Sequence, residues 1–311
     1  MKSTFQSSPR LREAVSRRSF LAALTGTALS NLPLAAIAAA QKSPNPLRIA
    51  ALDWGLAATV LSLGIEPVGV PAINFYNRYV VDPVMPVSVV DVGLLFTPNF
   101  ELLYELAPDL ILITPGLMPA RASLDRIGPL MVLDIAPRSG DPFKQAKAET
   151  LRLARAIDRD ATATALLDDT TRVIELGRQK LQHAYDHRPV FLINVIDDRH
   201  IRIFGAETLY QDVLQSIGLT NAWQGRSSPL PLGPDALLGV PEARIIVISS
   251  VAEQVTGQAL IASPFWRALP NVRAGRVHRL EPVLDSGGIS SARRFAALLS
   301  EALLASEPTH G

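Results

Sequence analysis

Residues 106–113 read LAPDLILI, and residues 240–247 read VPEARIIV. Each stretch places a proline and an acidic residue between the end of an expected helix and an apolar run. Proline cannot continue a helix, and its fixed φ sets the turn into the following strand. Continuously apolar runs are typical of strands buried on both faces, as in parallel α/β sheets. The same turn in both halves of the chain predicts two similar α/β lobes.

Apolar strands and helices alternate on both sides of a helical middle section. The strands expected from their apolar runs are residues 48–52, 67–70, 89–93, 109–113, 130–134, 190–195, 201–204 and 244–248. Between the two groups, residues 142–187 predict two helices with a break at 158–160, the second of roughly 25 residues, well above the usual helix length. We therefore predict an α/β fold with two Rossmann-like lobes, each with a central, mainly parallel sheet, joined by a single long α-helix. The predicted limits are an N-terminal lobe at 45–158, the connecting helix at 160–187 and a C-terminal lobe at 188–307.

The N-terminus has the three parts of a bacterial export signal, in order. Residues 16–21 read SRRSFL, an apolar run covers 20–34, and residues 35–40 are small and mostly alanine. The arginine pair marks the twin-arginine route, which carries folded proteins. We predict a twin-arginine signal peptide at 1–40, cleaved near Ala40, and a mature protein in the periplasm. A chance arginine pair before an amphipathic helix is the less favoured alternative.

Composition narrows the class of protein. The apolar run is shorter than the ~20 residues that span a bilayer. Residues 1–40 hold five basic residues and one acid, so the formal charge of +1 for the whole chain becomes −3 without them. A mildly acidic, exported protein is a poor nucleic-acid binder, and we expect a monomer. The absence of cysteine excludes disulfides, thiolate metal sites and iron–sulfur clusters.

No motif of catalysis occurs in the chain. It has no Gly-x-Ser-x-Gly, no P-loop and no Gly-x-Gly-x-x-Gly. His183 and His187 have a spacing that could bind a metal on a helix, but a role near the helix C-terminus is favoured, where histidine complements the dipole. A metal site in the polar turn at 197–200 is likewise the minority interpretation. We therefore predict that the protein is not an enzyme and has no cofactor.

Aromatic and basic residues follow the first two strands. Trp54 follows the first strand, and Tyr76, Arg78 and Tyr79 follow the second. Ligands of open α/β sheets bind outside the carboxyl ends of the strands. A ligand role is favoured for Trp54, whereas for the tyrosines packing of the loop onto the lobe is an equally good interpretation.

Several segments together resemble one family. In the first half these are residues 49–54 (IAALDW), 63–70 (LGIEPVGV), 90–94 (VDVGL), 97–103 (TPNFELL) and 108–109 (PD), and in the second half 198–200 (DRH), 204–205 (FG), 221–225 (NAWQG) and 264–276 (PFWRALPNVRAGR). They resemble the periplasmic iron(III)-hydroxamate siderophore-binding proteins, class III solute-binding proteins of ABC importers. The similarity covers essentially the whole chain after residue 40.

This resemblance implies a function and a site. It implies a shallow cleft between the lobes, in which a siderophore wraps the iron so that no protein side chain ligates it. The expected function is delivery of a ferric siderophore, of hydroxamate type, to a permease of an inner-membrane ABC importer. The alternatives are a receptor for another bulky chelate, such as a corrinoid, haem or another siderophore class, and an enzyme exported by the twin-arginine route.

The chain departs from the family at expected ligand contacts. Leu95 stands where the hydroxamate receptors have an arginine, and Leu117 where they have a tyrosine. Leu230 and residues 284–286, with Asp285 at their centre, stand near the positions of C-lobe aromatics. Trp54 is retained, Tyr79 stands where an aromatic is expected, and Arg202 or Arg78 could resupply the charge.

The resemblance also implies two docking acids. Glu101 matches an acid that relatives place against arginines of the permease, and Asp235 stands at the corresponding place in the second lobe. Both also lie where an acid would complement a helix dipole, which is compatible with docking.

Overall fold

The computed structural model describes residues 46–137, 140–227, 230–248 and 257–305. The predicted signal peptide at 1–40 and its cleavage site near Ala40 lie outside these ranges. Within them, none of the helices combines the length and apolar character that crossing a bilayer requires.

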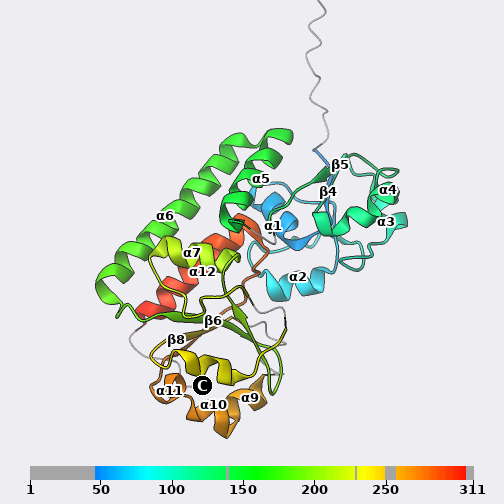
Figure 1. The fold of residues 1–311 in the computed structure, drawn as a ribbon. Coiled ribbons are helices and arrows are strands. Elements are labelled where there is room, and N and C mark those ends of the chain that lie inside the picture. The colour runs from blue at the N-terminus through cyan, green and yellow to red at the C-terminus, as the bar shows by residue number, and fades with distance from the viewer. Residues whose placement is uncertain (1–45, 138–139, 228–229, 249–256, 306–311) are drawn as a thin grey trace, which may run out of the picture. The chain divides into compact units, whose positions relative to one another are not determined.

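A five-stranded parallel sheet forms the core of the N-terminal lobe (Figure 1). Its strand order is β3-β2-β1-β4-β5, and β4 pairs with both β1 and β5. The apolar run at 110–113 forms β4, in which three of four residues are buried. The elements of this lobe are β1 (Ile49–Ala51), α1 (Trp54–Ser62), β2 (Gly69–Val70), α2 (Ile73–Tyr79), β3 (Val90–Asp91), α3 (Phe100–Leu106), β4 (Leu110–Ile113), η1 (Pro115–Ala120), α4 (Arg121–Leu124) and β5 (Leu130–Val132).

Hydrogen bonds join the turn at Pro108 and Asp109 to the start of the first strand, β1. Helix α3 ends at Leu106, and Ala107 takes a left-handed conformation with φ 42°. The Asp109 carboxylate accepts the backbone N–H of Arg48 at 2.9 Å. The Arg48 guanidinium in turn donates to the carbonyl of Leu106. These bonds satisfy the helix end and set the register of β4 beside β1.

The C-terminal lobe has a four-stranded mixed sheet of order β7-β6-β8-β9. Strands β6, β8 and β9 are parallel, and β7 runs antiparallel to β6 at one edge. Asn271 holds the second Pro-acid turn, since its amide donates to the carbonyls of Val240 and Ala243. The elements of this lobe are β6 (Val190–Val195), β7 (Ile201–Phe204), α7 (Leu209–Ile217), η2 (Pro234–Gly239), β8 (Arg244–Ile248), α9 (Gln258–Ala262), α10 (Pro264–Ala268), α11 (Pro270–Arg273), β9 (Val277–Leu280) and α12 (Gly288–Leu304).

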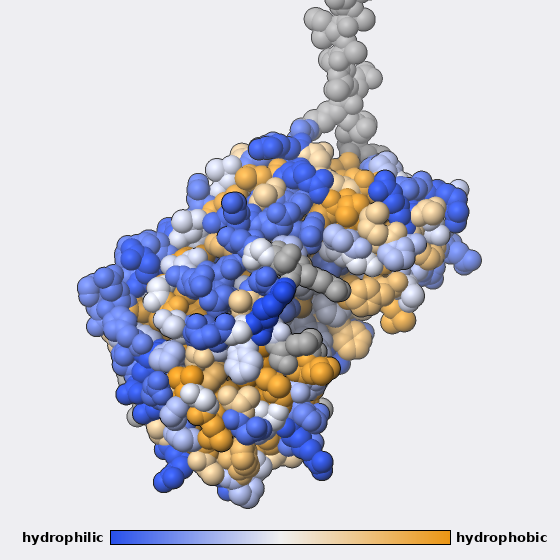
Figure 2. All heavy atoms as spheres, viewed as in Figure 1, coloured by the Kyte–Doolittle hydropathy of each residue, from blue (hydrophilic) through white to orange (hydrophobic). Residues whose placement is uncertain are grey.

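Two helices lie between the sheets in the sequence, α5 (Pro142–Ala156) and α6 (Asp160–Ala184). Helix α6 is 25 residues long, and its outer face is hydrophilic (Figure 2). Its inner face packs closely on α12. At Gly177 the two helices are so close that an added Cβ would collide with the Ser300 hydroxyl. This arrangement confirms the predicted α/β fold of two lobes joined by a long helix. The limits given for each lobe stay predictions, since residues 45–311 pack as one unit.

Helix α12 also reaches the N-terminal lobe. Its first turn packs against α1, and the hydroxyls of Ser62 and Ser290 share a hydrogen bond of 2.8 Å. The carbonyl of Ser286, just before α12, lies so close to Gly55 that a Cβ there would collide with it. The segment between β9 and α12 is therefore held against the start of α1.

A candidate ligand-binding cleft

A cavity of about 220 Å³ is lined by residues from both lobes. The N-terminal lobe contributes two aromatic side chains, and the C-terminal lobe contributes polar and apolar side chains from strands, α7 and the β9–α12 segment. The lining residues are Trp54, Tyr79, Asn194, Arg202, Phe204, Tyr210, Ile248, Pro282, Val283, Leu284 and Asp285. Because Trp54 follows β1 and Ile248 ends β8, the cavity lies at the carboxyl ends of parallel strands, where ligands of open α/β sheets bind.

Trp54 anchors an aromatic wall. The preceding residue, Asp53, caps α1 by accepting the backbone N–H groups of Gly55 and Leu56 at 2.8 and 3.1 Å. The Trp54 indole N–H donates to the carbonyl of Pro71 at 2.9 Å. Its ring stacks on Tyr79, with centroids 5.9 Å apart, and on Phe75 at 6.4 Å. The flat faces of this stack are thus fixed before a ligand arrives.

The Asp91 carboxylate positions the helix that carries Tyr79. It accepts the backbone N–H groups of Ala72, Ile73 and Gly93 at 2.9–3.0 Å. These bonds tie the start of α2 to the end of β3 and hold Ala72 in a left-handed conformation with φ 51°. Tyr79 then lies at the end of α2, beside Trp54.

The opposite wall comes from the C-terminal lobe. Asn194 on β6 pairs directly with Arg202 on β7, and its amide donates to the carbonyl of Ile248 at 3.1 Å. The Tyr210 hydroxyl donates to the carbonyl of Val283 at 2.6 Å, which holds the β9–α12 segment against α7. This wall combines polar and apolar side chains and is itself cross-linked by hydrogen bonds.

Arg202 and Asp285 bring opposite charges to the cavity. In the ranges that the structure describes, neither side chain forms an ion pair of 4.0 Å or less. Asp285 is exposed where it lines the cavity. Partial desolvation by nearby protein atoms raises the pKa of its carboxyl, while Arg202 and nearby backbone N–H groups act in the opposite direction.

A second polar cavity has a volume of about 370 Å³. Its polar lining includes Asp53, Thr114, Asp134 and Ser286. Burial raises the pKa of Asp53, and its two backbone hydrogen bonds oppose that rise. The two cavities are lined by neighbouring residues of the chain, since Trp54 and Asp285 line the first and Asp53 and Ser286 line the second.

The structure brings together four of the predicted site residues: Trp54, Tyr79, Arg202 and Asp285. Tyr76 lies elsewhere, because it points inward from α2 into the core of the N-terminal lobe. It is fully buried, and its hydroxyl donates to the carbonyl of Pro83 at 2.7 Å. Arg78 is exposed and lies over the ring of Phe75 at 5.8 Å, so only that ring connects it to the aromatic stack.

The three leucines at expected family contacts do not line the cavity of 220 Å³. Leu117 is 5% exposed and belongs to the core of the N-terminal lobe. Leu95 is half-buried, and Leu230 is exposed.

Sequence reasoning missed several lining residues, Asn194 and Tyr210 among them. Asn194 is the only polar residue in the strand Val190–Val195, and that exception was a signal that the sequence offered. Tyr210 gave none, since it reads as an ordinary apolar position of α7.

The predicted docking acids are exposed on separate elements. Glu101 lies in the first turn of α3, along a shallow groove of about 560 Å³ that Phe100, Tyr104 and Arg126 also line. Asp235 lies in the first turn of η2. Among the described residues, no three histidine, aspartate or glutamate side chains gather as a metal site would require.

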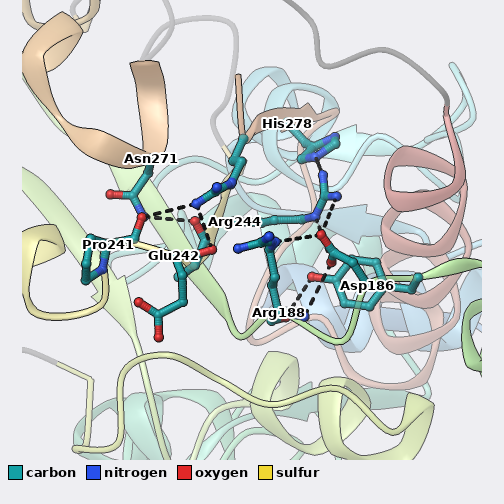
Figure 3. A network of polar contacts seen from close by, with 10 residues as sticks. Asp186, Arg188, Pro241, Glu242, Arg244, Asn271 and His278 are labelled. Atoms are coloured by element: carbon teal, nitrogen blue, oxygen red, sulfur yellow. Dashed lines mark hydrogen bonds and ion pairs between the residues drawn. The ribbon is translucent and has the colours of Figure 1, made fainter. Parts of the chain in front are cut away.

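A charged network occupies the opposite end of the C-terminal sheet (Figure 3). The Arg244 guanidinium pairs with Asp186 at 3.0 Å and lies 3.1 Å from His278 Nε2. Arg188 also pairs with Asp186 at 2.7 Å. Because Arg244 starts β8 and His278 lies near the start of β9, this network fastens the amino ends of the strands, away from the cavity.

Comparison with known proteins agrees with this geometry. A family model described as periplasmic binding protein matches residues 49–284. The iron(3+)-hydroxamate-binding protein FhuD of Escherichia coli is 32% identical over 292 residues, covering 93% of this chain and 97% of that protein. The chain belongs to the periplasmic binding protein family.

Solved structures of similar proteins share its fold. The siderophore-binding protein FhuD of Vibrio cholerae, crystallised with Fe³⁺–Desferal, is 30% identical with a TM-score of 0.79, covering 85% of this chain and all 100% of that one. The petrobactin-binding protein YclQ of Bacillus subtilis has a TM-score of 0.68 at 18% identity, covering 83% of this chain and 92% of that one. At that identity the second match shows the fold alone.

Proposed function

We propose that this periplasmic binding protein captures a ferric siderophore of hydroxamate type and delivers it to an ABC importer in the inner membrane. The observation that carries the proposal is the cavity in which Trp54 and Tyr79 face Arg202 and Asp285. Flat aromatic faces suit the apolar surface of a wrapped chelate, and the charged wall suits its polar edge. The relatives bind iron(III) hydroxamate and Fe³⁺–Desferal, which supports the same class of ligand here.

The charge of the site favours hydroxamates over catecholates. Three hydroxamates carry one negative charge each and neutralise Fe(III), whereas three catecholates leave a complex of charge −3. Among the described residues, Asp285 lines the first cavity and Asp53 and Asp134 line the second, and Arg202 is the one basic residue that lines either. A trianion would therefore meet net repulsion at close range.

The compartment follows from the family and the N-terminus. The family is periplasmic, and the segment at 1–40 supports export by the twin-arginine route with cleavage near Ala40. We propose that the mature receptor acts as a monomer, has no resident cofactor and catalyses no reaction, because the iron arrives already wrapped by its ligand.

Tryptophan fluorescence tests ligand class. A panel of ferric hydroxamates, catecholates, citrate, haem and a corrinoid is titrated against the protein, and hydroxamates should quench most strongly at the lowest concentration. The chain has three tryptophans, Trp54, Trp223 and Trp266. Trp54→Phe should remove most of the quenching, and the matched variant Trp223→Phe should retain it. A response confined to haem or a corrinoid, or to no chelate, would overturn the proposal.

Docking to the importer is tested separately. Glu101 and Asp235 are exposed acids on different lobes, which suits pairing with arginines of a permease. Glu101→Arg should leave chelate binding unchanged and abolish uptake by cells that depend on this receptor. The matched variant Asp125→Arg, at an exposed acid that follows α4, should retain uptake. Full uptake with Glu101→Arg would remove Glu101 from the docking surface.

A further inference from the structure

We infer that Asp285 forms a subsite for a positively charged arm of the ligand, so that the receptor prefers a ferric hydroxamate bearing a primary ammonium group over its uncharged counterpart. This inference rests on the proposed function and names the ligand within the hydroxamate class. It assigns different side chains of one cavity to different parts of the chelate.

The place of Asp285 in the fold supports a ligand role. It lies in the segment between β9 and α12, and its side chain lines the cavity at the wall opposite Trp54 and Tyr79. Helix α12 begins at Gly288, its N-cap is Gly287, and no side chain caps it. The Asp285 side chain therefore does not cap α12.

Asp285 also lacks a close cation among the described residues. Arg202 lines the same cavity and attracts it electrostatically, but no ion pair of 4.0 Å or less joins them within the part of the chain described. A carboxylate at a cavity wall, with no cation within 4.0 Å, gains from a ligand cation that approaches within hydrogen-bond distance. A primary ammonium supplies three N–H donors and a full charge, whereas the amide of an N-acetylated arm supplies one weaker donor.

We assign the iron-binding part of the chelate to Arg202. Its guanidinium has N–H donors in a fixed fork, which suit the oxygen atoms that surround the iron. Asn194 pairs with Arg202 across the two strands. Its side-chain amide N–H donates to the carbonyl of Ile248, and its side-chain oxygen can accept a hydrogen bond from another group. The lining of the cavity thus includes a donor, Arg202, and an acceptor, Asp285.

The surroundings strengthen the preference for a cation. The adjoining cavity presents Asp53 and Asp134, and Ser286 lines that cavity directly after Asp285. A flexible arm that passes Asp285 remains in a region of negative potential. An anionic arm would be repelled in the same region.

Two chelates that differ at one nitrogen test the inference. Fe³⁺–Desferal carries a terminal primary ammonium, and its N-acetylated form is the same ferric trihydroxamate without that charge. Calorimetric titration should show that the unaltered protein binds the ammonium form about 10 to 100 times more tightly, the range of one charge-assisted hydrogen bond. High salt should reduce this ratio.

Variants locate the effect. Asp285→Asn should bring the two affinities to within about threefold by weakening only the ammonium form, since a single charge pair is lost. The matched variant Asp198→Asn, at an exposed acid in the β6–β7 turn, should keep the full ratio. Asp285→Glu should retain a preference for the ammonium form.

The outcomes separate the two proposals. Equal affinities of the unaltered protein for both chelates would overturn the inference and leave the hydroxamate receptor standing. A preference that Asp285→Asn leaves intact would also overturn it. Failure to bind either chelate would overturn the proposed function itself. If Asp285→Asn does not fold, equal affinities of the unaltered protein would still overturn the inference, and Asp285→Ser takes the place of Asp285→Asn in locating a preference.

Discussion

The two walls of the cleft are built differently. The N-terminal wall consists of the stacked rings of Trp54 and Tyr79, with Phe75 stacked on Trp54 outside the cavity lining, on a lobe whose sheet is entirely parallel. The C-terminal wall carries Asn194, Arg202 and Asp285 on a lobe whose sheet has an antiparallel edge. The N-terminal lobe therefore offers flat aromatic surfaces, and the C-terminal lobe offers charged side chains.

Sheet topology explains the division. In the parallel lobe all strands end at the same edge, and helices α1 and α2 start there, so their first and last turns fill the site with rings. In the other lobe, β7 returns beside β6, and its alternating pattern buries Ile201 and Ile203 while Arg202 stays exposed. An edge strand can thus present a charge to the cleft without disturbing the core. We expect the aromatic wall to set affinity for all chelates and the charged wall to set the choice among them.

Removing the central ring should have the largest effect on binding. Trp54→Ala should weaken every hydroxamate chelate by about 100-fold, close to 3 kcal/mol, because a large, fixed aromatic face is lost from the centre of the site. Calorimetric titration checks the loss. The control is Tyr104→Ala, which removes an exposed aromatic ring on α3, away from the cavity. If both variants bind alike, or if the loss at Trp54 depends strongly on ligand charge, the division between the walls is wrong.

The contact between the walls can be strained directly. A Cβ at Gly55 would collide with the carbonyl of Ser286 and approach Ile135 Cδ1 at 2.6 Å. Gly55→Ala should therefore destabilise the protein by about 2 kcal/mol, the usual range for overpacking. Gly239→Ala is the matched control, because nothing lies within 4 Å of its added Cβ. Chemical denaturation measures both, and equal midpoints would show that the segment before α12 yields without cost.

The sequence predicted the fold better than the site. The turns at Pro108 and Pro241, the apolar strands and the long helix are local patterns, so they identify the lobes without tertiary information. Trp54 was predicted because it directly follows a strand. Tyr76 and Tyr79 show the limit, since they share one short helix and only the packed structure tells which points inward.

Compensating residues were harder to find. Leu95 and Leu117 stand where the family resemblance led us to expect an arginine and a tyrosine, but a sequence does not show which distant side chain faces the same cavity. Arg202 was one of two candidates, and the pairing of β6 with β7 is what places it there. Tyr210 acts through a hydrogen bond to Val283, 73 residues away in the chain, which no local pattern encodes.

A like-charge pair lies where α5 approaches α7, with Asp141 at the N-cap of α5 and Asp212 on α7. Burial, with Asp141 nearby, raises the pKa of Asp212 to about 6, although a backbone N–H bond from Phe143 opposes the rise. The folded state thus binds this proton more tightly than the unfolded state. Its stabilising contribution is complete below the ordinary value of 3.8 and is lost as pH rises through about 6.

Asp212→Asn keeps that position neutral at every pH. At pH 7 the variant should be about 1 kcal/mol more stable, a figure reduced for solvent screening at this half-exposed site. The gain should vanish toward pH 4, where Asp212 is protonated anyway. Urea denaturation at several pH values checks this, with Asp168→Asn on α6 as the control. A gain that does not depend on pH would contradict the explanation.

The smallest expected effect is a loss of folding stability in acid, and it should arise in the C-terminal lobe. All five histidines follow residue 182, and His278 is 4% exposed beside Arg244. Burial, and then the charge of Arg244, lower the pKa of His278, so the unfolded state binds this proton more readily. Its contribution to stability is therefore complete above an unfolded pKa of about 6.5 and declines as pH falls through the folded value.

His278→Gln retains an acceptor for Arg244 but cannot titrate, so its stability should fall less between pH 7 and pH 5 than that of the unaltered protein. Urea denaturation over this range measures the slopes, and an equal effect of His183→Gln, at an exposed position of α6, would show that His278 is not the titrating group.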